Sequence, residues 1–118
     1  MIRGIGIDLV EIERIQKQFK QKERFMNRIL TVREKAACQQ LNSERRQLEY
    51  LAGRFAAKEA FSKAVGTGIG QLSFQDIEIL NDEHGAPYIT ATGFDHEKLF
   101  ISISHTEHYA TAQVVIEK

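Results

Sequence analysis

The sequence predicts a single α+β domain in which helices, including one long central helix, pack on a mainly antiparallel sheet. Three observations predict it: an alternating apolar stretch at the start, helical periodicity through the middle, and short alternating stretches after residue 72. One strand, then helices, then strands with no long helix between them is typical of this class. A chain of 118 residues supports one domain with a modest core, so residues 1–118 are expected to fold as one unit.

The first half of the chain predicts one strand followed by helices. Residues 2–10 predict the strand, because apolar side chains at alternate positions share one face, whereas Gly4, Gly6 and Asp8 share the other. That second face is nearly bare apart from one carboxylate, and it would let a helix approach closely. Apolar residues at helical spacing then predict helices at residues 11–20, 22–30, 31–41 and 44–65.

Local signals mark where some of these helices begin and end. Thr31 and Glu34 stand at the spacing of a capping box, so a helix is expected to begin there. The triplet Gly66, Thr67 and Gly68 follows the longest helix, where a glycine is favoured as the cap. A phosphate-cradling loop would instead precede a helix and use its N-terminal dipole, so the triplet predicts a helix end first.

The second half of the chain predicts strands joined by turns. The NDEHG segment and the pair Thr106-Glu107 are turn signals. Pro87, the lone proline, begins a strand, where no ladder hydrogen bond is lost. Residues 92–99 are expected to form one or two helical turns. Alternating stretches predict strands at residues 73–80, 87–90, 100–105 and 108–118.

The composition excludes several classes of protein. With 42% hydrophobic and 27% charged residues, the chain has the composition of a globular protein and not of a disordered one. Its net charge of +0 gives no global argument for nucleic acid or a membrane. Cys38, the single cysteine, is interpreted as a small apolar residue on a helix. The N-terminal stretch is too weakly apolar for a signal peptide and too short to span a bilayer, which predicts a cytoplasmic protein.

The longest predicted helix carries charges that are candidates for a site. Glu59 and Lys63 are four residues apart and share one helix face, which is also the spacing of an ordinary surface ion pair. Alanines surround them at positions 56, 57, 60 and 64. Such small residues suit a close-packed or concave surface better than an open one, and a carboxylate there needs a partner.

Asp8 is the candidate partner of Glu59. Its neighbours in the predicted strand are apolar, and burying a carboxylate there is costly unless it is paired or binds a cation. Two carboxylates suit Mg²⁺, which completes its coordination with water and phosphate oxygens. Lys63 would then supply a point charge to a phosphate. A buried salt bridge from Asp8 to an arginine is the alternative interpretation, and the residues alone favour neither.

Two further features admit both a functional and a plain structural interpretation. The basic run before residue 29 is either a solvated face or a surface for an acidic partner, and it lacks the interleaved aromatic residues that bind single-stranded nucleic acid. Ser104 and His105 end a predicted strand, where polar groups face a ligand or simply form a turn. The basic run consists of Arg14, Lys17, Lys20, Lys22, Arg24 and Arg28.

Four segments carry a family resemblance when they are taken together. They read GIGIDLVEI, FMNRILTVRE, LAGRFAAKEAFSKAVGTG and SISHTEHYATA, in that order along essentially the whole chain. This set resembles the holo-acyl-carrier-protein synthases, the small class of 4′-phosphopantetheinyl transferases; the G-I-D strand with a downstream F-x-x-K-E-A-x-x-K helix is the most specific pairing. The resemblance implies the fold of that family over residues 1–118.

The resemblance also implies an activity. Family members transfer the phosphopantetheine arm of coenzyme A to a serine of apo acyl carrier protein, releasing adenosine 3′,5′-bisphosphate, with Mg²⁺ as cofactor. Asp8 and Glu59 match the metal ligands of the family, and Lys63 matches the lysine on the transferred phosphate. The serine proton would pass either to Glu59 or to a metal-bound water. The implied setting is fatty acid biosynthesis in the cytoplasm, with no nucleic acid or membrane partner.

Binding residues are implied in the same way. The residues that match coenzyme A contacts are Arg54, Lys63, Gly66, Thr67, Gly68, Ser104 and His105. The residues that match the dock for the acidic helix of the carrier protein are Arg14, Arg24, Phe25 and Arg28. Short members of this family resemble trimers with sites between subunits, so a homotrimer is expected.

One departure and one competing hypothesis remain. Lys35 stands where some relatives have an acidic residue, which argues against a proton acceptor at the helix start near Glu34. The competing hypothesis is a non-enzymatic adaptor whose basic helices bind an acidic protein or nucleic acid. It predicts partner binding that is indifferent to Asp8, Glu59 and coenzyme A.

Overall fold

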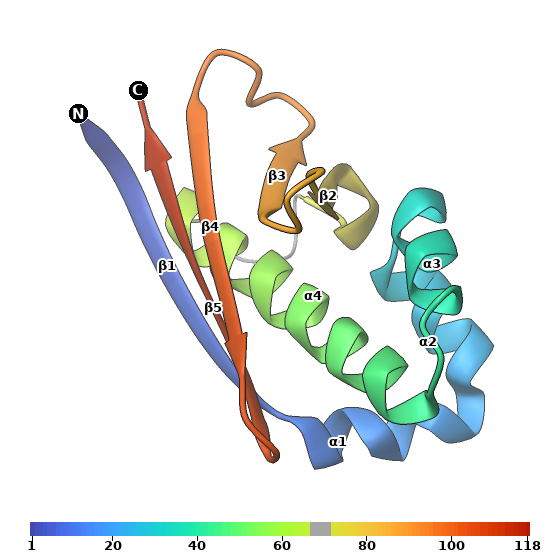
Figure 1. The fold of residues 1–118 in the computed structure, drawn as a ribbon. Helices are drawn as coiled ribbons and strands as arrows, with labels where there is room; N and C mark the ends of the chain where they lie inside the picture. Colours follow the sequence, from blue (N-terminus) through green and yellow to red (C-terminus); the bar gives the residue numbers. More distant parts are fainter. Residues whose placement is uncertain (67–71) are drawn as a thin grey trace.

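Two antiparallel sheets and a long helix build the fold (Figure 1). The computed structural model describes residues 1–66 and 72–118. The larger sheet has the strand order β1-β5-β4, and β2 pairs with β3 in a second sheet. The predicted α+β class with antiparallel pairing is confirmed, although the strands divide between two sheets. The strands are β1 (Ile2–Glu11), β2 (Ile77–Asn81), β3 (Pro87–Ala91), β4 (Lys98–His105) and β5 (Tyr109–Glu117).

The helical block lies between β1 and β2 along the chain. Figure 1 shows α4 running across one face of the larger sheet, with α2 and α3 on the far side of α4 and the two chain termini close together. No helix within the two described ranges is long and apolar enough to cross a membrane. The helices are α1 (Ile12–Gln16), α2 (Lys22–Ile29), α3 (Val32–Gln39) and α4 (Glu44–Val65), with short 3₁₀ segments η1 (Lys17–Gln21) and η2 (Phe74–Asp76).

Glycines on β1 let α4 lie directly against the sheet. A Cβ atom on Gly4 would lie 2.0 Å from the carbonyl oxygen of Ala64, and one on Gly6 would lie 1.9 Å from that of Ala60. Both distances are far below any van der Waals contact, and the obstacle is backbone rather than a mobile side chain. The helix α4 therefore packs on the glycine face of β1, and this close contact brings side chains of the two elements within reach of each other.

None of the helices in the described part of the chain covers the opposite face of the larger sheet (Figure 1). Ile5, Ile7 and Leu9 on β1 are 60%, 61% and 64% exposed, and Phe100 on β4 is 51% exposed. Pairing across β5 puts Ile5 in line with Phe100, because both lie opposite Val115. A contiguous apolar surface of this kind marks an interaction site more often than free solvent.

The helix ends that were predicted from capping signals agree with the structure, whereas three other predicted stretches differ from it. The Thr31 and Glu34 capping box is present, and Gly66 caps α4 in the left-handed region at φ 95°. The helix expected over 11–20 turns into 3₁₀ geometry at residue 17. The strand expected from residue 73 begins only at 77, because Ser73 and Asp76 form their own capping box around η2. Residues 92–97 form turns and no helix, with a left-handed Gly93 at φ 88°.

Candidate active site

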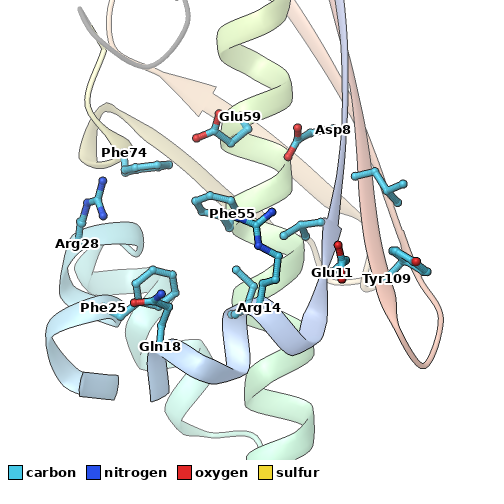
Figure 2. A pocket seen from close by; sticks show the side chains of 13 residues that line it. Asp8, Glu11, Arg14, Gln18, Phe25, Arg28, Phe55, Glu59, Phe74 and Tyr109 are labelled. Carbon is cyan, nitrogen blue, oxygen red and sulfur yellow. The ribbon is translucent and has the colours of Figure 1, made fainter. Parts of the chain in front are cut away.

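A cavity of about 710 Å³ opens beside α4, between β1 on one side and α1 and α2 on the other. Figure 2 shows the carboxylates of Asp8 and Glu59 at one end of it, with Arg14 and Arg28 entering from α1 and α2. Polar and aromatic groups thus face a common space large enough for part of a sizeable ligand. The lining residues are Asp8, Leu9, Val10, Glu11, Arg14, Ile15, Gln18, Phe25, Arg28, Phe55, Glu59, Phe74 and Tyr109.

Asp8 and Glu59 come from different elements and repel each other. The close contact of Gly4 and Gly6 with α4 places Asp8, two residues beyond Gly6, beside the C-terminal half of that helix, within reach of Lys63. Burial raises the pKa of the Glu59 carboxyl, and the negative charge of Asp8 raises it further, whereas Lys63 and Arg28 lower it. Two mutually repelling carboxylates in a cavity form a place where a cation is favoured.

Lys63 pairs with Asp8 and not with its helical neighbour. Its Nζ lies 3.0 Å from Asp8 Oδ1 and also donates to the carbonyl oxygen of Ile7 at 3.0 Å. The described residues contain no ion pair between Lys63 and Glu59, so the surface-pair interpretation is wrong. The arginine partner considered for Asp8 is likewise replaced by this lysine. Because the Lys63 side chain is 55% exposed, its ammonium can serve a ligand in the same place.

The donor set at this end of the cavity fits Mg²⁺. Asp8 and Glu59 supply carboxylate oxygens, the ligands that this hard cation prefers, and one or two of them suffice when water and phosphate fill the other positions. No cluster of three or more His, Cys, Asp or Glu side chains placed for a metal exists in residues 1–66 and 72–118. These residues therefore cannot complete the coordination of a metal by themselves. They suit an open metal site that a phosphate-bearing ligand would help to fill.

The raised pKa of Glu59 predicts a stability effect in metal-free buffer. Since folding favours the neutral carboxyl, ionised Glu59 lowers stability, and the loss sets in as pH rises through and above the ordinary carboxyl pKa. We expect Glu59→Gln to melt at a slightly higher temperature than the unsubstituted protein near about pH 7, and at the same temperature near about pH 4, where both side chains are neutral. Thermal melts with a chelator at the two pH values measure this. A lower melting temperature for Glu59→Gln near pH 7 would contradict it.

The wall facing the carboxylates is cationic and aromatic. The Arg28 guanidinium lies 5.8 Å from the centre of the Phe74 ring, and Phe74 stacks on Phe55 at 5.8 Å. Arg14 and Phe25 complete this wall. Three of the four residues expected to dock a carrier protein thus line the cavity. Arg24, the fourth, lies on α2 with Phe25 and Arg28 but is not part of the lining. Phe55 is the first residue of the F-x-x-K-E-A-x-x-K motif but was given no site role, and no sequence signal had pointed to Phe74.

Arg54, and Ser104 and His105 at the end of β4, lie outside the lining of this cavity within one chain. Arg54 is 7% exposed, donates to Ile79 O at 3.3 Å and to Asn81 Oδ1 at 3.2 Å, and stacks 4.0 Å from the Tyr50 ring centre. His105 Nδ1 lies 3.8 Å from Glu49 Oε2.

Ser104 lies at the end of β4. It pairs with Thr111, which also pairs with Leu9 on the outer sheet face. Gly66 is exposed at the end of α4, whereas Thr67 and Gly68 lie outside the described residues.

A buried ion pair beneath the cavity is the feature that the sequence analysis missed. Lys58 and Glu34 are both 0% exposed, and Lys58 Nζ lies 2.6 Å from Glu34 Oε1. Burial lowers the pKa of Lys58, and the charge of Glu34 opposes that shift. Glu34 also accepts from the backbone N–H groups of Thr31 at 2.8 Å and Ile79 at 2.7 Å. These bonds and its complete burial seal Glu34 from a ligand in this chain.

Comparison with known proteins decides the family. A model of the 4′-phosphopantetheinyl transferase superfamily matches residues 4–116. The chain belongs to this superfamily. Within it, the holo-[acyl-carrier-protein] synthase of Geobacillus kaustophilus is 60% identical over 119 residues, covering 100% of this chain and 91% of that protein. The synthase of Bacillus subtilis is 56% identical over 119 residues, covering 100% and 98%.

Solved structures of the superfamily share the fold. The holo-(acyl-carrier-protein) synthase from Bacillus anthracis, in complex with CoA (3′,5′-ADP), has a TM-score of 0.90 at 49% identity and covers 100% of this chain and 98% of its own. The synthase from Neisseria meningitidis has a TM-score of 0.87 at 40% identity and covers 100% of both chains. The predicted resemblance, and the 4′-phosphopantetheinyl transferase fold that it implied, are confirmed.

Proposed function

We propose that the protein is a holo-[acyl-carrier-protein] synthase, which transfers 4′-phosphopantetheine from coenzyme A to a serine of apo acyl carrier protein. The products are holo acyl carrier protein and adenosine 3′,5′-bisphosphate, and the setting is fatty acid biosynthesis in the cytoplasm. The observation that carries the proposal is the meeting of Asp8, Glu59 and Lys63 at one end of a cavity, in a chain of this superfamily. Two carboxylates and an ammonium suit a pyrophosphate better than they suit a neutral ligand.

Asp8 and Glu59 are the residues that would hold Mg²⁺. Bound there, the cation would neutralise charge on the pyrophosphate and on the leaving bisphosphate. Lys63 contributes a half-exposed ammonium that would turn from Asp8 to a phosphate oxygen once Mg²⁺ balanced the charge of that carboxylate. In the transfer, the serine oxygen forms a bond to the phosphorus of the phosphopantetheine arm while the bond from that phosphorus to the bridging oxygen breaks. Glu59 is one candidate to accept the serine proton.

The cationic wall suits an acidic carrier protein. Arg14 and Arg28 present positive charge on the cavity wall, and Phe25 on the same wall offers an apolar contact. Arg24 extends the same surface along α2. A carrier that docks here would bring its serine toward Asp8 and Glu59, so the basic helices and the carboxylates belong to one site. This removes the need for a separate adaptor function.

The separation of Arg54, Ser104 and His105 from the cavity supports a site shared between subunits. In a homotrimer, the outer face of the larger sheet, with Ile7 in its middle, would be covered, and the exposed Ser104 and His105 could reach coenzyme A held by a neighbouring subunit. Arg54 is buried against Ile79 and Asn81 and would act from within its own chain. An apolar face that is more than half exposed in one chain fits such an interface. Gly66, Thr67 and Gly68 are kept in the coenzyme A contact as part of this proposal.

The trimer makes a prediction of its own. Ile7→Glu places a charge on the exposed sheet face without touching the core of the chain, so we expect a folded monomer with at least about tenfold lower transfer activity. Size-exclusion chromatography with light scattering gives the mass, and circular dichroism checks the fold. Val32→Glu is the matched control, because Val32 is an equally apolar residue, 86% exposed, on α3. A fully active trimer in Ile7→Glu would speak against the interface.

The transfer reaction is the direct test of the proposed function. Purified protein, coenzyme A, Mg²⁺ and apo carrier protein should yield a carrier whose mass has grown by one phosphopantetheine group. Omitting Mg²⁺ in the presence of a chelator should stop the gain. An apo carrier that a known synthase can modify, but that gains no mass here, would sink the proposal.

A further inference from the structure

The C-terminal turn of α2 is held by side chains from two other elements. The last carbonyl groups of any α-helix lack partners within the helix. In α2, Met26 O accepts from Leu30 N, so the unpartnered carbonyls are those of the four residues that follow Met26. All four accept from side chains far along the chain. These residues are Asn27, Arg28, Ile29 and Leu30.

Gln75 of η2 supplies the first set of these bonds. Its Nε2 lies 2.9 Å from Asn27 O, 2.8 Å from Leu30 O and 3.4 Å from Arg28 O. One exposed amide thus spans the whole terminal turn. Because the donors sit on η2, they fix the end of α2 relative to the element that carries Phe74.

Lys58 of α4 donates the hydrogen bond to the fourth carbonyl group, that of Ile29. Its Nζ lies 2.7 Å from Ile29 O and 3.0 Å from Phe74 O, besides the contact with Glu34. A positive charge at a helix C-terminus is also favoured by the helix dipole. This ammonium therefore joins α2, η2 and α4 at one point, and the next residue on α4 is Glu59.

The elements joined in this way carry opposite walls of the cavity. Arg28 and Phe25 lie on α2, Phe74 lies on η2 and Glu59 lies on α4. A buried ion pair is often no more stabilising than apolar residues of the same volume, so stability alone does not account for Lys58 and Glu34. The hydrogen bonds of Lys58 to Ile29 and Phe74 account for this pair better, because they are directional and fix the position of the cationic wall relative to the carboxylates.

We propose that Lys58 and Gln75 are positioning residues, together an α2 clamp, that hold Arg28 and Phe25 at the distance from Glu59 that an acidic carrier protein requires. The inference rests on the proposed function. The clamp acts on engagement of the carrier and not on coenzyme A, because its bonds fix the α2 wall, while Asp8 and Lys63 are held by β1 and α4 without it.

The first test replaces Gln75 with methionine, which keeps the length of the side chain and removes its donors. We expect the KM for apo carrier protein to rise about fivefold to tenfold, with the KM for coenzyme A unchanged within about twofold. Hydrogen exchange should become faster at the amides of α2 in the free protein, with no change in α4. Gln39→Met, at an exposed glutamine of α3, is the control for which no parameter moves.

The second test separates positioning from direct contact with the carrier. Lys58 is fully buried and cannot touch a partner, so the double variant Lys58→Met with Glu34→Met should raise the same KM and spare that for coenzyme A. An unchanged KM for the carrier in Gln75→Met, equal rises for both substrates, or no faster exchange in α2 would each overturn the clamp. So would a folded double variant with ordinary carrier kinetics. If the double variant does not fold, the exchange and KM data on Gln75→Met decide.

The two proposals fail in different ways. If the unsubstituted protein transfers nothing to a competent carrier, the proposed function is wrong. If it transfers normally and Gln75→Met leaves carrier KM and α2 exchange unaltered, only the clamp is wrong.

Discussion

Glu59→Gln should lower the rate of phosphopantetheine transfer by about a thousandfold or more while leaving the fold intact. Glutamine keeps the shape of the side chain but removes one of the two carboxylates facing the cavity, so the charge that attracts a divalent cation is halved there. Asp8 remains, paired with Lys63, and Lys63 then competes for it without opposition. The loss should appear in kcat, because charge on the pyrophosphate and the leaving bisphosphate is no longer neutralised.

The measurement is the mass gain of apo carrier protein under single-turnover conditions. Binding of Mn²⁺, followed by electron paramagnetic resonance, gives a readout independent of turnover and should weaken in parallel. Glu83→Gln is the matched control, since Glu83 lies 88% exposed in the turn between β2 and β3 and is not part of the cavity lining. Transfer by Glu59→Gln at more than about a tenth of the normal rate would remove Glu59 from the site.

Gly6→Ala should destabilise the fold by about 4 kcal/mol or more, an effect reserved for severe backbone clashes. The added Cβ would lie 1.9 Å from Ala60 O and 2.8 Å from Ala64 N. Neither atom can move aside without displacing α4 from the sheet. Since Asp8 is on the same strand and Glu59 on that helix, the two carboxylates would also be driven apart.

Urea unfolding followed by circular dichroism measures the change. Gly53→Ala is the control: its Cβ would meet only the Cγ2 of Ile103, at 3.2 Å, and alanine favours a helix, so we expect a change within about 1 kcal/mol. If Gly6→Ala unfolds at the same urea concentration as the unsubstituted protein, the glycines are not what allows α4 to pack closely against β1.

Fold elements with local signals were predictable from the sequence. The bounds of α4, the capping box at Thr31 and the cap at Gly66 all follow from interactions within a few residues, and each agrees with the structure. Residues 73–76 were wrongly predicted as part of a strand, and this error also comes from interactions within a few residues. A Ser73 and Asp76 capping box competes with apolar alternation, and the local hydrogen bonds prevail over the strand.

The candidate site was only partly predictable. The alternation of β1 put Asp8 on the glycine face, and helical spacing put Glu59 and Lys63 together, so a shared site could be inferred from short-range rules. The choice of Lys63 as the partner of Asp8 could not, because an ion pair across 55 residues depends on where α4 sits on the sheet. Family resemblance supplied roles for Arg54 and His105, which remain predictions.

Lys58 shows most clearly where sequence reasoning stops. In the sequence it is one more charged residue on a helix, next to Glu59 and indistinguishable in type from Lys63. The fold buries it completely against Ile29, Glu34 and Phe74, at separations of 29, 24 and 16 residues, while Lys63 stays largely in solvent. Periodicity and caps depend on neighbours in the chain, so the sequence was sufficient for the elements and the glycine face. Burial and ion pairing depend on which distant segments meet, and only the packing of α2, α3 and η2 around α4 turned one lysine into a structural junction and left the other free to face a ligand.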